Sequence, residues 1–139
     1  MQTFYPFEDQ TKTFACLDYK RLGKQRVEGY QILRTLAGVS NGWKNHPAVR
    51  MWRCFEPALV DYTLNACKAW SDRGYTDNIA DKIFEEFPEW VDADPIVYPS
   101  WTRRPDVLNS HKAMLYHKDR VHYSEFAIHA DIVDYVWPV

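Results

Sequence analysis

The 139-residue sequence has no apolar run long enough to cross a membrane, and its first residues lack the basic start and apolar centre of a secretion signal. It has only three cysteines, Cys16, Cys54 and Cys67, which are too few and too scattered for a disulfide framework. We therefore expect a cytoplasmic protein with reduced, packed thiols and no membrane partner.

Strand-like alternation, internal repeats and low-complexity tracts are also missing from the sequence. Hydrophobic residues make up 46% and charged residues 26%, a composition that excludes a disordered chain. The length is that of one ordinary domain. We expect an all-α fold, in which residues 1–139 form a single compact helical domain with a long N-terminal helix and irregular proline-rich connections.

Helix start and stop signals give approximate boundaries. The opening segment is expected to be an extended arm to about residue 13, followed by a long helix over residues 14–37 that Gly38 ends. Gly23 and Gly29 lie inside that helix, which indicates close approach by another helix or by a ligand. Further helices are expected at residues 47–72 (interrupted at Pro57), 77–87 and 105–117, with an irregular stretch at 88–104.

Charge is unevenly distributed although the formal net charge is only −2. Residues 19–53 carry eight basic residues against the single acid Glu28, residues 76–98 carry seven acids against Lys82, and residues 102–120 carry a net charge of +3. A chain polarised in this way can hold a phosphate backbone on one face. The alternative is that the basic residues form solvated helix faces that pair with the acidic segment.

The long helix carries two sets of residues at helical spacing. Arg26 lies in the middle of the expected core stripe, where its charge needs a carboxylate, carbonyl groups or a ligand phosphate. The stripe comprises Tyr19, Leu22, Tyr30, Leu33 and Ala37, and the adjacent polar set comprises Asp18, Arg21, Gln25 and Glu28. Such a polar set could line a cleft that binds a phosphate and a base. It fits a buried structural network equally well.

No metal or cofactor is expected. His111, His117 and His122 are six and five residues apart, which is not the spacing of metal ligands on a helix. Trp43 and Trp52 have rings that can stack on a displaced base, although packing in the core is the more common role of such side chains.

Three segments together resemble a known family. The run Leu17-Asp18-Tyr19-Lys20-Arg21-Leu22-Gly23-Lys24-Gln25-Arg26-Val27-Glu28 is followed by Gly42-Trp43-Lys44-Asn45-His46-Pro47, and then by a block from Ser110 to Tyr123. The second segment is similar to the G-[YW]-[RK]-N-H-P signature of the pyrimidine dimer DNA glycosylases, the group named for the phage endonuclease V repair enzyme. Order, spacing and length match over most of the chain, and small bacterial and phage members are the most similar.

The resemblance implies a compact all-α protein whose first long helix lies along double-stranded DNA that is bent and has a base flipped out. It further implies that an N-terminal α-amine attacks C1′ of the damaged nucleotide, assisted by a helix glutamate, and that β-elimination then cuts the strand. An α-amine suits this role because more of it is uncharged at neutral pH than of a lysine side chain.

Two positions depart from the family pattern. Gln2 is too bulky to favour removal of Met1, so we expect Met1 to remain and to present the amine. An ungapped alignment places Gly23 where the family has its glutamate, which leaves Asp18 and Glu28 as candidates for that role. The expected catalytic residues are Met1, Gln2, Asp18, Arg21, Gln25 and Glu28. The expected DNA contacts are Lys20, Arg21, Lys24, Arg26, Lys44, His46, Arg50, Arg103, Arg104, His111 and Lys112.

The leading hypothesis is thus a DNA glycosylase with AP lyase activity on damaged or modified pyrimidines, most simply as a monomer. Two alternatives stay open: a non-catalytic DNA-binding protein of the same fold, and a different reaction on nucleotides or bases built on the polar set of the long helix.

Overall fold

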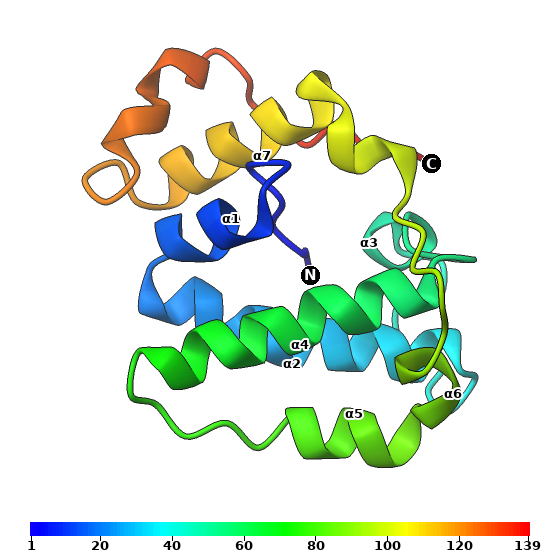
Figure 1. Ribbon diagram of the computed structural model, residues 1–139. Coiled ribbons are helices and arrows are strands. Elements are labelled where there is room, and N and C mark those ends of the chain that lie inside the picture. The colour runs from blue at the N-terminus through cyan, green and yellow to red at the C-terminus, as the bar shows by residue number, and fades with distance from the viewer.

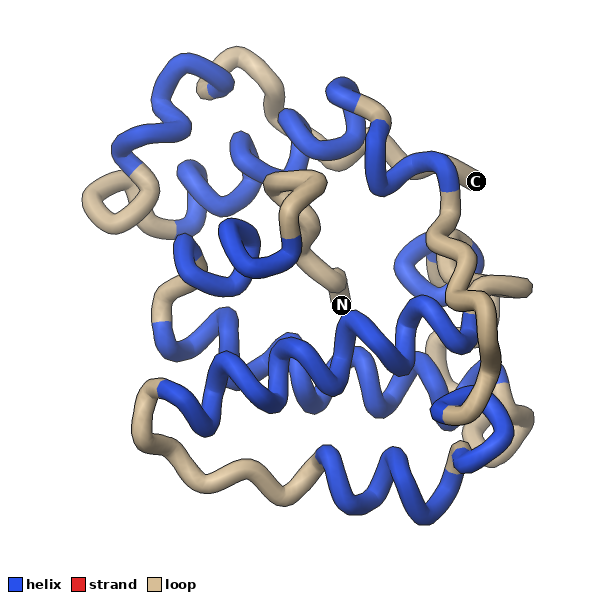
Figure 2. Tube along the Cα trace, viewed as in Figure 1, coloured by secondary structure: helices blue, strands red, loops and turns tan.

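The computed structural model describes residues 1–139 and is entirely helical, with no strands (Figures 1 and 2). This confirms the all-α prediction, and no helix is long and apolar enough to span a membrane. The seven α-helices are α1 (Gln10–Cys16), α2 (Tyr19–Leu36), α3 (Pro47–Arg50), α4 (Glu56–Asp72), α5 (Ala80–Glu86), α6 (Pro88–Val91) and α7 (Pro105–Lys118), and the two 3-10 helices are η1 (Ser100–Arg103) and η2 (Ser124–His129).

The expected long helix from residue 14 to residue 37 is wrong in two respects: α1 already begins at Gln10, inside the segment expected to be an arm, and the chain breaks between α1 and α2. Leu17 is extended (ψ 136°), and Asp18 precedes the first turn of α2. The carbonyl groups at the end of α1 receive hydrogen bonds from Arg73, which follows α4. Its guanidinium donates to the oxygens of Phe14 and Leu17 at 2.8 Å each. The break allows α1 to leave the direction of α2.

The expected interruption near Pro57 is confirmed. Pro57 lies in the first turn of α4, where its missing N–H removes no helical hydrogen bond. Cys54, between α3 and α4, has a positive φ of 71°, and its side chain is exposed, contrary to the expectation that all three thiols are packed. The proline-rich stretch 88–104 is more regular than expected, since it contains α6 and η1.

Helices α2 and α4 pack side by side and form the largest helix contact (Figure 1). Gly29 allows this approach, because a Cβ there would lie 2.2 Å from the Thr63 hydroxyl oxygen. The glycines of α2 therefore mark contact with a helix. The core stripe of α2 is rotated from the expected one: Tyr19 is 55% exposed and Ala37 is exposed. Its buried positions are Leu22, Gln25, Arg26, Gly29, Ile32 and Leu33.

The N-terminal arm is extended, as expected, but it is also buried. In Figure 1 it runs from α1 into the space between α7 and the α2–α4 pair. Each of these helices holds its backbone: Gln25 on α2 accepts from the N–H of Phe4 at 2.8 Å, and His111 on α7 accepts from the N–H of Tyr5 at 2.8 Å. The start of the chain is thereby fixed inside the protein, against the polar side of α2.

Trp52 belongs to this buried framework. Its indole N–H donates to the Thr3 hydroxyl at 2.8 Å, and its side chain has no exposed surface. Trp52 therefore has a packing role and cannot stack on a base, whereas Trp43 is 60% exposed.

Candidate active site and nucleic-acid interface

The buried arm and α2 enclose one side of a cavity of about 280 Å³. Most of the polar residues that the sequence placed on one face of the long helix lie in its wall, together with the first residues of the chain. The lining residues are Met1, Gln2, Phe4, Arg21, Lys24, Gln25, Glu28, Lys118 and Tyr135.

Helical spacing explains why α2 presents these groups together. Arg21, Gln25 and Glu28 are four and three residues apart, so they follow one face of the helix. Glu28 contacts the start of the chain directly, because its Oε2 accepts from the N–H of Gln2 at 3.2 Å. A carboxylate is therefore held one residue from the first amine of the chain.

Gln25 has a fixed orientation in the cavity wall. Its Oε1 accepts from the N–H of Phe4, and the hydroxyl of Tyr62 lies 2.9 Å from the same oxygen. The Phe4 N–H requires the carbonyl oxygen at that end, so the Nε2 amide group is directed the other way. The Tyr62 hydroxyl also lies 2.6 Å from the carbonyl oxygen of Phe4. That nitrogen is buried and has no hydrogen-bond partner.

Gln2 is the second amide with unused hydrogen-bonding capacity. Its side chain is 4% exposed, and neither its Oε1 nor its Nε2 has a partner. Buried polar groups without partners are uncommon and cost about 1–3 kcal/mol each. Three buried side-chain atoms of these two glutamines, Gln25 Nε2 and both polar atoms of Gln2, thus have no hydrogen-bond partner.

His46 lies at the start of α3, near enough to the N-terminal amine for its charge to act on the ring. Its Nδ1 accepts from the N–H of Ala48 at 3.0 Å and caps α3, which leaves Nε2 as the nitrogen that carries hydrogen. The ring lies edge-on to Trp43 and Trp137, each at 5.7 Å between centroids. Burial, and secondly the nearby positive charge of the N-terminal amine, lower the pKa of His46, so the neutral ring is favoured.

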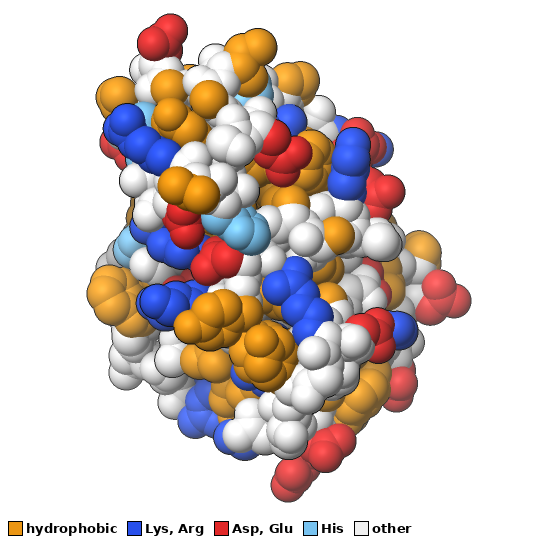
Figure 3. Space-filling model, turned by 90° about the vertical axis from the view of Figure 1, so that its left-hand side faces the viewer, with side chains coloured by type: hydrophobic (Ala, Val, Ile, Leu, Met, Phe, Trp, Pro, Cys, Tyr) orange, Lys and Arg blue, Asp and Glu red, His pale blue; other side chains and the backbone are white.

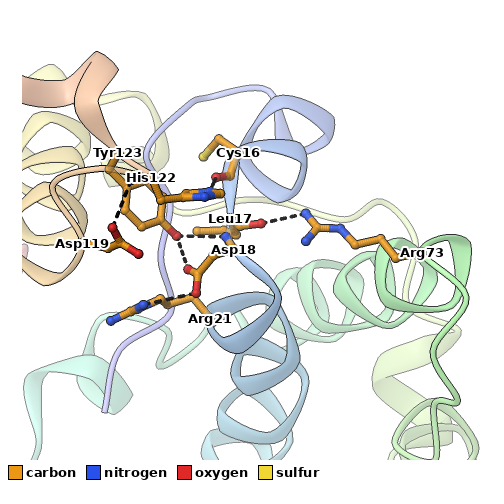
Figure 4. A network of polar contacts seen from close by, with 8 residues as sticks. All are labelled: Cys16, Leu17, Asp18, Arg21, Arg73, Asp119, His122 and Tyr123. Atoms are coloured by element: carbon orange, nitrogen blue, oxygen red, sulfur yellow. Dashed lines mark hydrogen bonds and ion pairs between the residues drawn. The ribbon is translucent and has the colours of Figure 1, made fainter.

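Asp18 lies outside this cavity and is held by other groups (Figure 4). Its carboxylate accepts from the hydroxyl of Tyr123, and Arg21 donates to it at 3.2 Å. The same hydroxyl accepts from the backbone N–H of Asp18 at 3.0 Å. Burial alone would raise the pKa of Asp18, but the Tyr123 hydrogen bond and the Arg21 charge outweigh it and the pKa is lowered. Asp18 therefore ties α2 to the C-terminal segment and positions Arg21 at the cavity.

Comparison with known sequences identifies the family. The sequence profile of the pyrimidine dimer DNA glycosylases matches residues 1–83, which is more than half of the chain. The chain belongs to this family. No curated protein and no solved structure matches it. The matched part contains the arm, α2 and α4, but stops before the Ser110–Tyr123 block, whose family resemblance stays a prediction.

Members of the pyrimidine dimer DNA glycosylase family act on DNA. Two basic residues of the segment 19–53 are used internally: Arg26, an expected DNA contact, and Arg34. Arg26 forms an ion pair with Asp77 and lies 4.6 Å from the centre of the Trp70 ring, with its side chain 10% exposed. Arg34 donates to Glu86 at 2.7 Å. For these two residues the alternative interpretation holds, since the acidic segment neutralises them. The Nη1 group of Arg26 is bound to Asp77, so little of this side chain is exposed to a phosphate.

The surface reflects this partial neutralisation. On the face shown in Figure 3, Lys and Arg side chains are interspersed with acidic, histidine and hydrophobic side chains, and they do not form a continuous basic surface. Several cations expected at the DNA remain exposed without an ion pair: Lys20, Lys24, Lys44, Arg50 and Arg103. Arg104 is exposed but pairs with Asp106 at 2.8 Å.

His111 and Lys112 do not belong to this exposed set. His111 is 1% exposed, accepts from Tyr5, and burial lowers its pKa to about 3. The Lys112 ammonium lies 4.7 Å from the centre of the Phe7 ring, and burial lowers its pKa. Both residues therefore pack α7 against the arm, contrary to their expected place at the DNA. No three His, Cys, Asp or Glu side chains are grouped so that they could hold a metal ion.

Sequence reasoning missed Phe4, Lys118 and Tyr135 in the lining of the cavity. It also missed Tyr62 of α4, whose hydroxyl lies beside Gln25 Oε1. No local pattern relates Lys118, Tyr135 or Tyr62 to residues 1–28, because they meet only through the tertiary fold. The aromatic start Phe4-Tyr5 was a signal that the arm is buried, since exposed arms seldom carry such residues.

Proposed function

We propose that this protein is a DNA glycosylase with AP lyase activity on double-stranded DNA that contains damaged or modified pyrimidines, and that the α-amine of Met1 is its nucleophile. One observation carries the proposal: the Glu28 carboxylate lies 3.2 Å from the N–H of Gln2, next to the amine and in the wall of the same cavity. An amine beside a carboxylate that can accept and return protons is the pair this chemistry needs.

In the reaction, the amine lone pair forms a bond to C1′ while the glycosidic bond breaks. The electrons of the broken bond leave with the base, which takes up a proton. The amine gives up its proton to Glu28, and protonation of the ring oxygen by Glu28 opens the sugar to the iminium. Loss of a proton from C2′ then expels the 3′ phosphate, which is the lyase step.

The position of Gly23 supports Glu28 in this role over residue 23. A Cβ at Gly23 would lie 3.0 Å from the Trp70 ring of α4, so this position faces α4, whereas the cavity is lined by other positions of α2. The ungapped alignment that places the family glutamate at Gly23 therefore does not describe which α2 position serves the site. Asp18 is less suited because it is already bound by Tyr123 and Arg21.

The exposed cations next to the cavity supply the phosphate contacts in this proposal. Lys24 and Lys118 lie in its wall, and Lys20 is exposed one helical turn before Lys24. Lys44 and Arg50 lie close in sequence to His46, whose ring is near enough to the amine for its charge to lower the pKa of the ring. Phosphates held by these side chains place C1′ of a flipped nucleotide beside Met1.

Borohydride trapping tests the proposal. The purified protein is incubated with a duplex that holds one abasic site, and sodium borohydride reduces any iminium to a stable covalent adduct. We expect an adduct from the wild-type protein and none after selective acetylation of the α-amine. Intact mass measured beforehand shows whether Met1 is retained. Absence of an adduct, with salt-dependent duplex binding intact, would instead favour a non-catalytic DNA-binding protein.

A further inference from the structure

The exposed ring of Trp43 lies close to the start of the chain, on the loop before α3. We propose that this ring stacks on the face of a DNA base that borders the abasic nucleotide, where the missing base leaves that face uncovered. The proposal rests on the proposed function, because an abasic duplex is the substrate of the lyase step. It adds a reason for the protein to prefer a duplex with a gap in its base stack to an intact duplex.

The backbone of Trp43 is held in a conformation that a bulky residue seldom adopts. Its φ is 64°, in the left-handed region where the Cβ atom crowds the backbone. Three consecutive carbonyl groups, those of residues 42–44, each accept a hydrogen bond that fixes this turn. The donors are the Thr35 hydroxyl at 2.9 Å, the His46 N–H at 2.8 Å and the Arg53 guanidinium at 3.1 Å. Such a conformation persists only where the surrounding structure imposes it, and it is typical of functional sites.

This strained backbone presents the indole ring to solvent and not to the core. Trp43 is 60% exposed, and its ring contacts one other aromatic side chain, edge-on, at 5.7 Å from the His46 ring between centroids. A large apolar ring that stays in water contributes little to folding, so burial of the side chain does not offset the cost of the turn. A strained turn with an exposed ring therefore indicates a partner outside the protein.

The position of the ring relates it to the proposed nucleophile. Burial and the charge of the nearby N-terminal amine both lower the pKa of His46, which the Trp43 ring contacts. His46 also lies 5.7 Å from the Trp137 ring, which lies 5.2 Å from the ring of Tyr135 in the cavity wall. Neighbouring bases of one strand are about 3.4 Å apart. The ring and the amine are therefore close enough to meet nucleotides a few steps apart on one duplex.

A DNA base is the partner that this surface fits. Lys44 follows Trp43 directly and Arg50 ends α3, and both are exposed without an ion pair, so phosphates can be held on either side of the ring. An intact duplex covers both faces of every internal base, whereas a missing base uncovers the faces of its two neighbours. Stacking of a base on an aromatic side chain strengthens binding by about 5- to 150-fold and tolerates any sequence.

Equilibrium binding to two duplexes tests the proposal without any chemical step. One duplex is fully paired, and the other has the same sequence with one tetrahydrofuran abasic analogue, which has no aldehyde and cannot form an iminium. We expect the wild-type protein to bind the tetrahydrofuran duplex at least about fivefold more tightly, because only this duplex offers an uncovered base face.

Two variants assign the preference to the ring. Trp43→Gly should bind the two duplexes with nearly equal affinity, and Trp43→Phe, which keeps a smaller ring, should retain part of the preference. Phe84→Ala removes an aromatic side chain of α5 that is 52% exposed, and as the matched control it should keep the wild-type ratio. Differences in flexibility between the two duplexes cancel, because the same DNA is compared between variants.

The fluorescence of 2-aminopurine placed next to the tetrahydrofuran residue reports the contact directly. Stacking quenches this base, so its emission should fall when the wild-type protein binds and should stay constant with Trp43→Gly. The salt dependence of binding should be the same for both proteins, because Lys44 and Arg50 are unchanged. Equal quenching by both proteins would assign the contact to another residue and overturn the proposal.

The thermal stability of Trp43→Gly separates a binding role from a structural one. Glycine adopts a φ of 64° without a Cβ penalty, and the lost ring is mostly exposed, so the Tm of the free protein should not fall. A fall of more than about 5 °C would show that the ring serves the fold, and an unchanged affinity ratio would show that it does not contact the gap. Either result overturns the proposal.

Borohydride trapping remains a separate test. A preference for the tetrahydrofuran duplex that depends on Trp43, without an adduct on abasic DNA, would support this inference and count against the amine chemistry. An adduct together with an unchanged affinity ratio in Trp43→Gly would support the proposed function and overturn the stacking role of Trp43.

Discussion

The backbone N–H of Gln2 and the carboxylate of Glu28 are joined at 3.2 Å across 26 residues of sequence. This contact brings the start of the chain to the middle of α2 and defines one side of the cavity. The arm is held in this place by α2 and α7, because Gln25 accepts from the N–H of Phe4 and His111 accepts from the N–H of Tyr5. The first amine is thereby placed by the core of the protein, not by a flexible terminus.

Glu28→Gln should remove most of the base release and strand cleavage. The amide cannot exchange protons with the amine or the sugar, so turnover should fall by about 10²–10⁴-fold. The side chain remains isosteric, so duplex affinity and Tm should change little. Single-turnover cleavage of an abasic duplex measures the loss of strand cleavage, and single-turnover reaction of an ultraviolet-irradiated duplex measures the loss of base release, with the exposed Glu89→Gln as the control. Wild-type turnover in Glu28→Gln would remove this residue from the reaction.

Lys24→Ala should weaken duplex binding in a salt-dependent way. Lys24 is exposed beside the cavity and has no ion pair. Loss of one phosphate contact reduces the slope of log K against log salt by about 1. Titrations at several salt concentrations measure the slope. Lys68→Ala, on α4 and paired with Asp72 on its own helix, should keep the wild-type slope; equal slopes for all three proteins would place Lys24 away from DNA.

Arg26→Ala should destabilise the protein by about 3–5 kcal/mol without weakening phosphate contacts. Its removal leaves Asp77 buried and unpaired, and also removes the cation above Trp70. Urea unfolding gives the stability change, and duplex affinity is measured at a temperature where the variant is folded. A stable Arg26→Ala protein that binds DNA poorly would restore Arg26 to the interface.

His111 should make stability depend on pH below neutrality. Burial lowers its pKa to about 3 in the folded protein, against about 6.5 for an unfolded histidine. Between these values the unfolded chain binds one more proton than the folded one, so stability decreases by about 1.4 kcal/mol for each pH unit as pH falls from about 6.5 towards 3.

His111→Asn provides the comparison, because the Asn side-chain oxygen can still accept from the N–H of Tyr5 but does not titrate. The difference between the two unfolding curves, measured from pH 7 to pH 4, isolates this histidine from the carboxylates. Parallel curves would show that His111 is protonated as readily in the folded state as in the unfolded one.

The ends of helices were predicted well where a nearby residue, such as glycine, terminates the helix. Gly38 has a positive φ of 79° and follows α2 as expected, and Gly74, with a φ of 93°, follows α4 in the same way. The break at Leu17 was not predicted, because it depends on Arg73 and Tyr123, which approach from elsewhere in the fold. Helix propensity alone contains no information on such partners.

The polar face of α2 was visible in the sequence because helical spacing alone brings Arg21, Gln25 and Glu28 together. The sequence did not show which basic residues of α2 form ion pairs and which stay free. Arg26 and Arg34 lie on the same helix as Lys20 and Lys24, but only the tertiary fold brings Asp77 and Glu86 to the first two. Similarly, burial of His111 depends on α7 packing against the arm, which no residue near position 111 indicates.

The most direct test of the central claim is to map the site of the borohydride adduct. The reduced complex on an abasic duplex is digested with nuclease and protease, and the modified peptide is sequenced by mass spectrometry. Our account predicts the adduct on the α-amine of the Met1 peptide. Lys24 and Lys118 also present amines at this cavity, so an adduct on either lysine, with the α-amine unmodified, would contradict it.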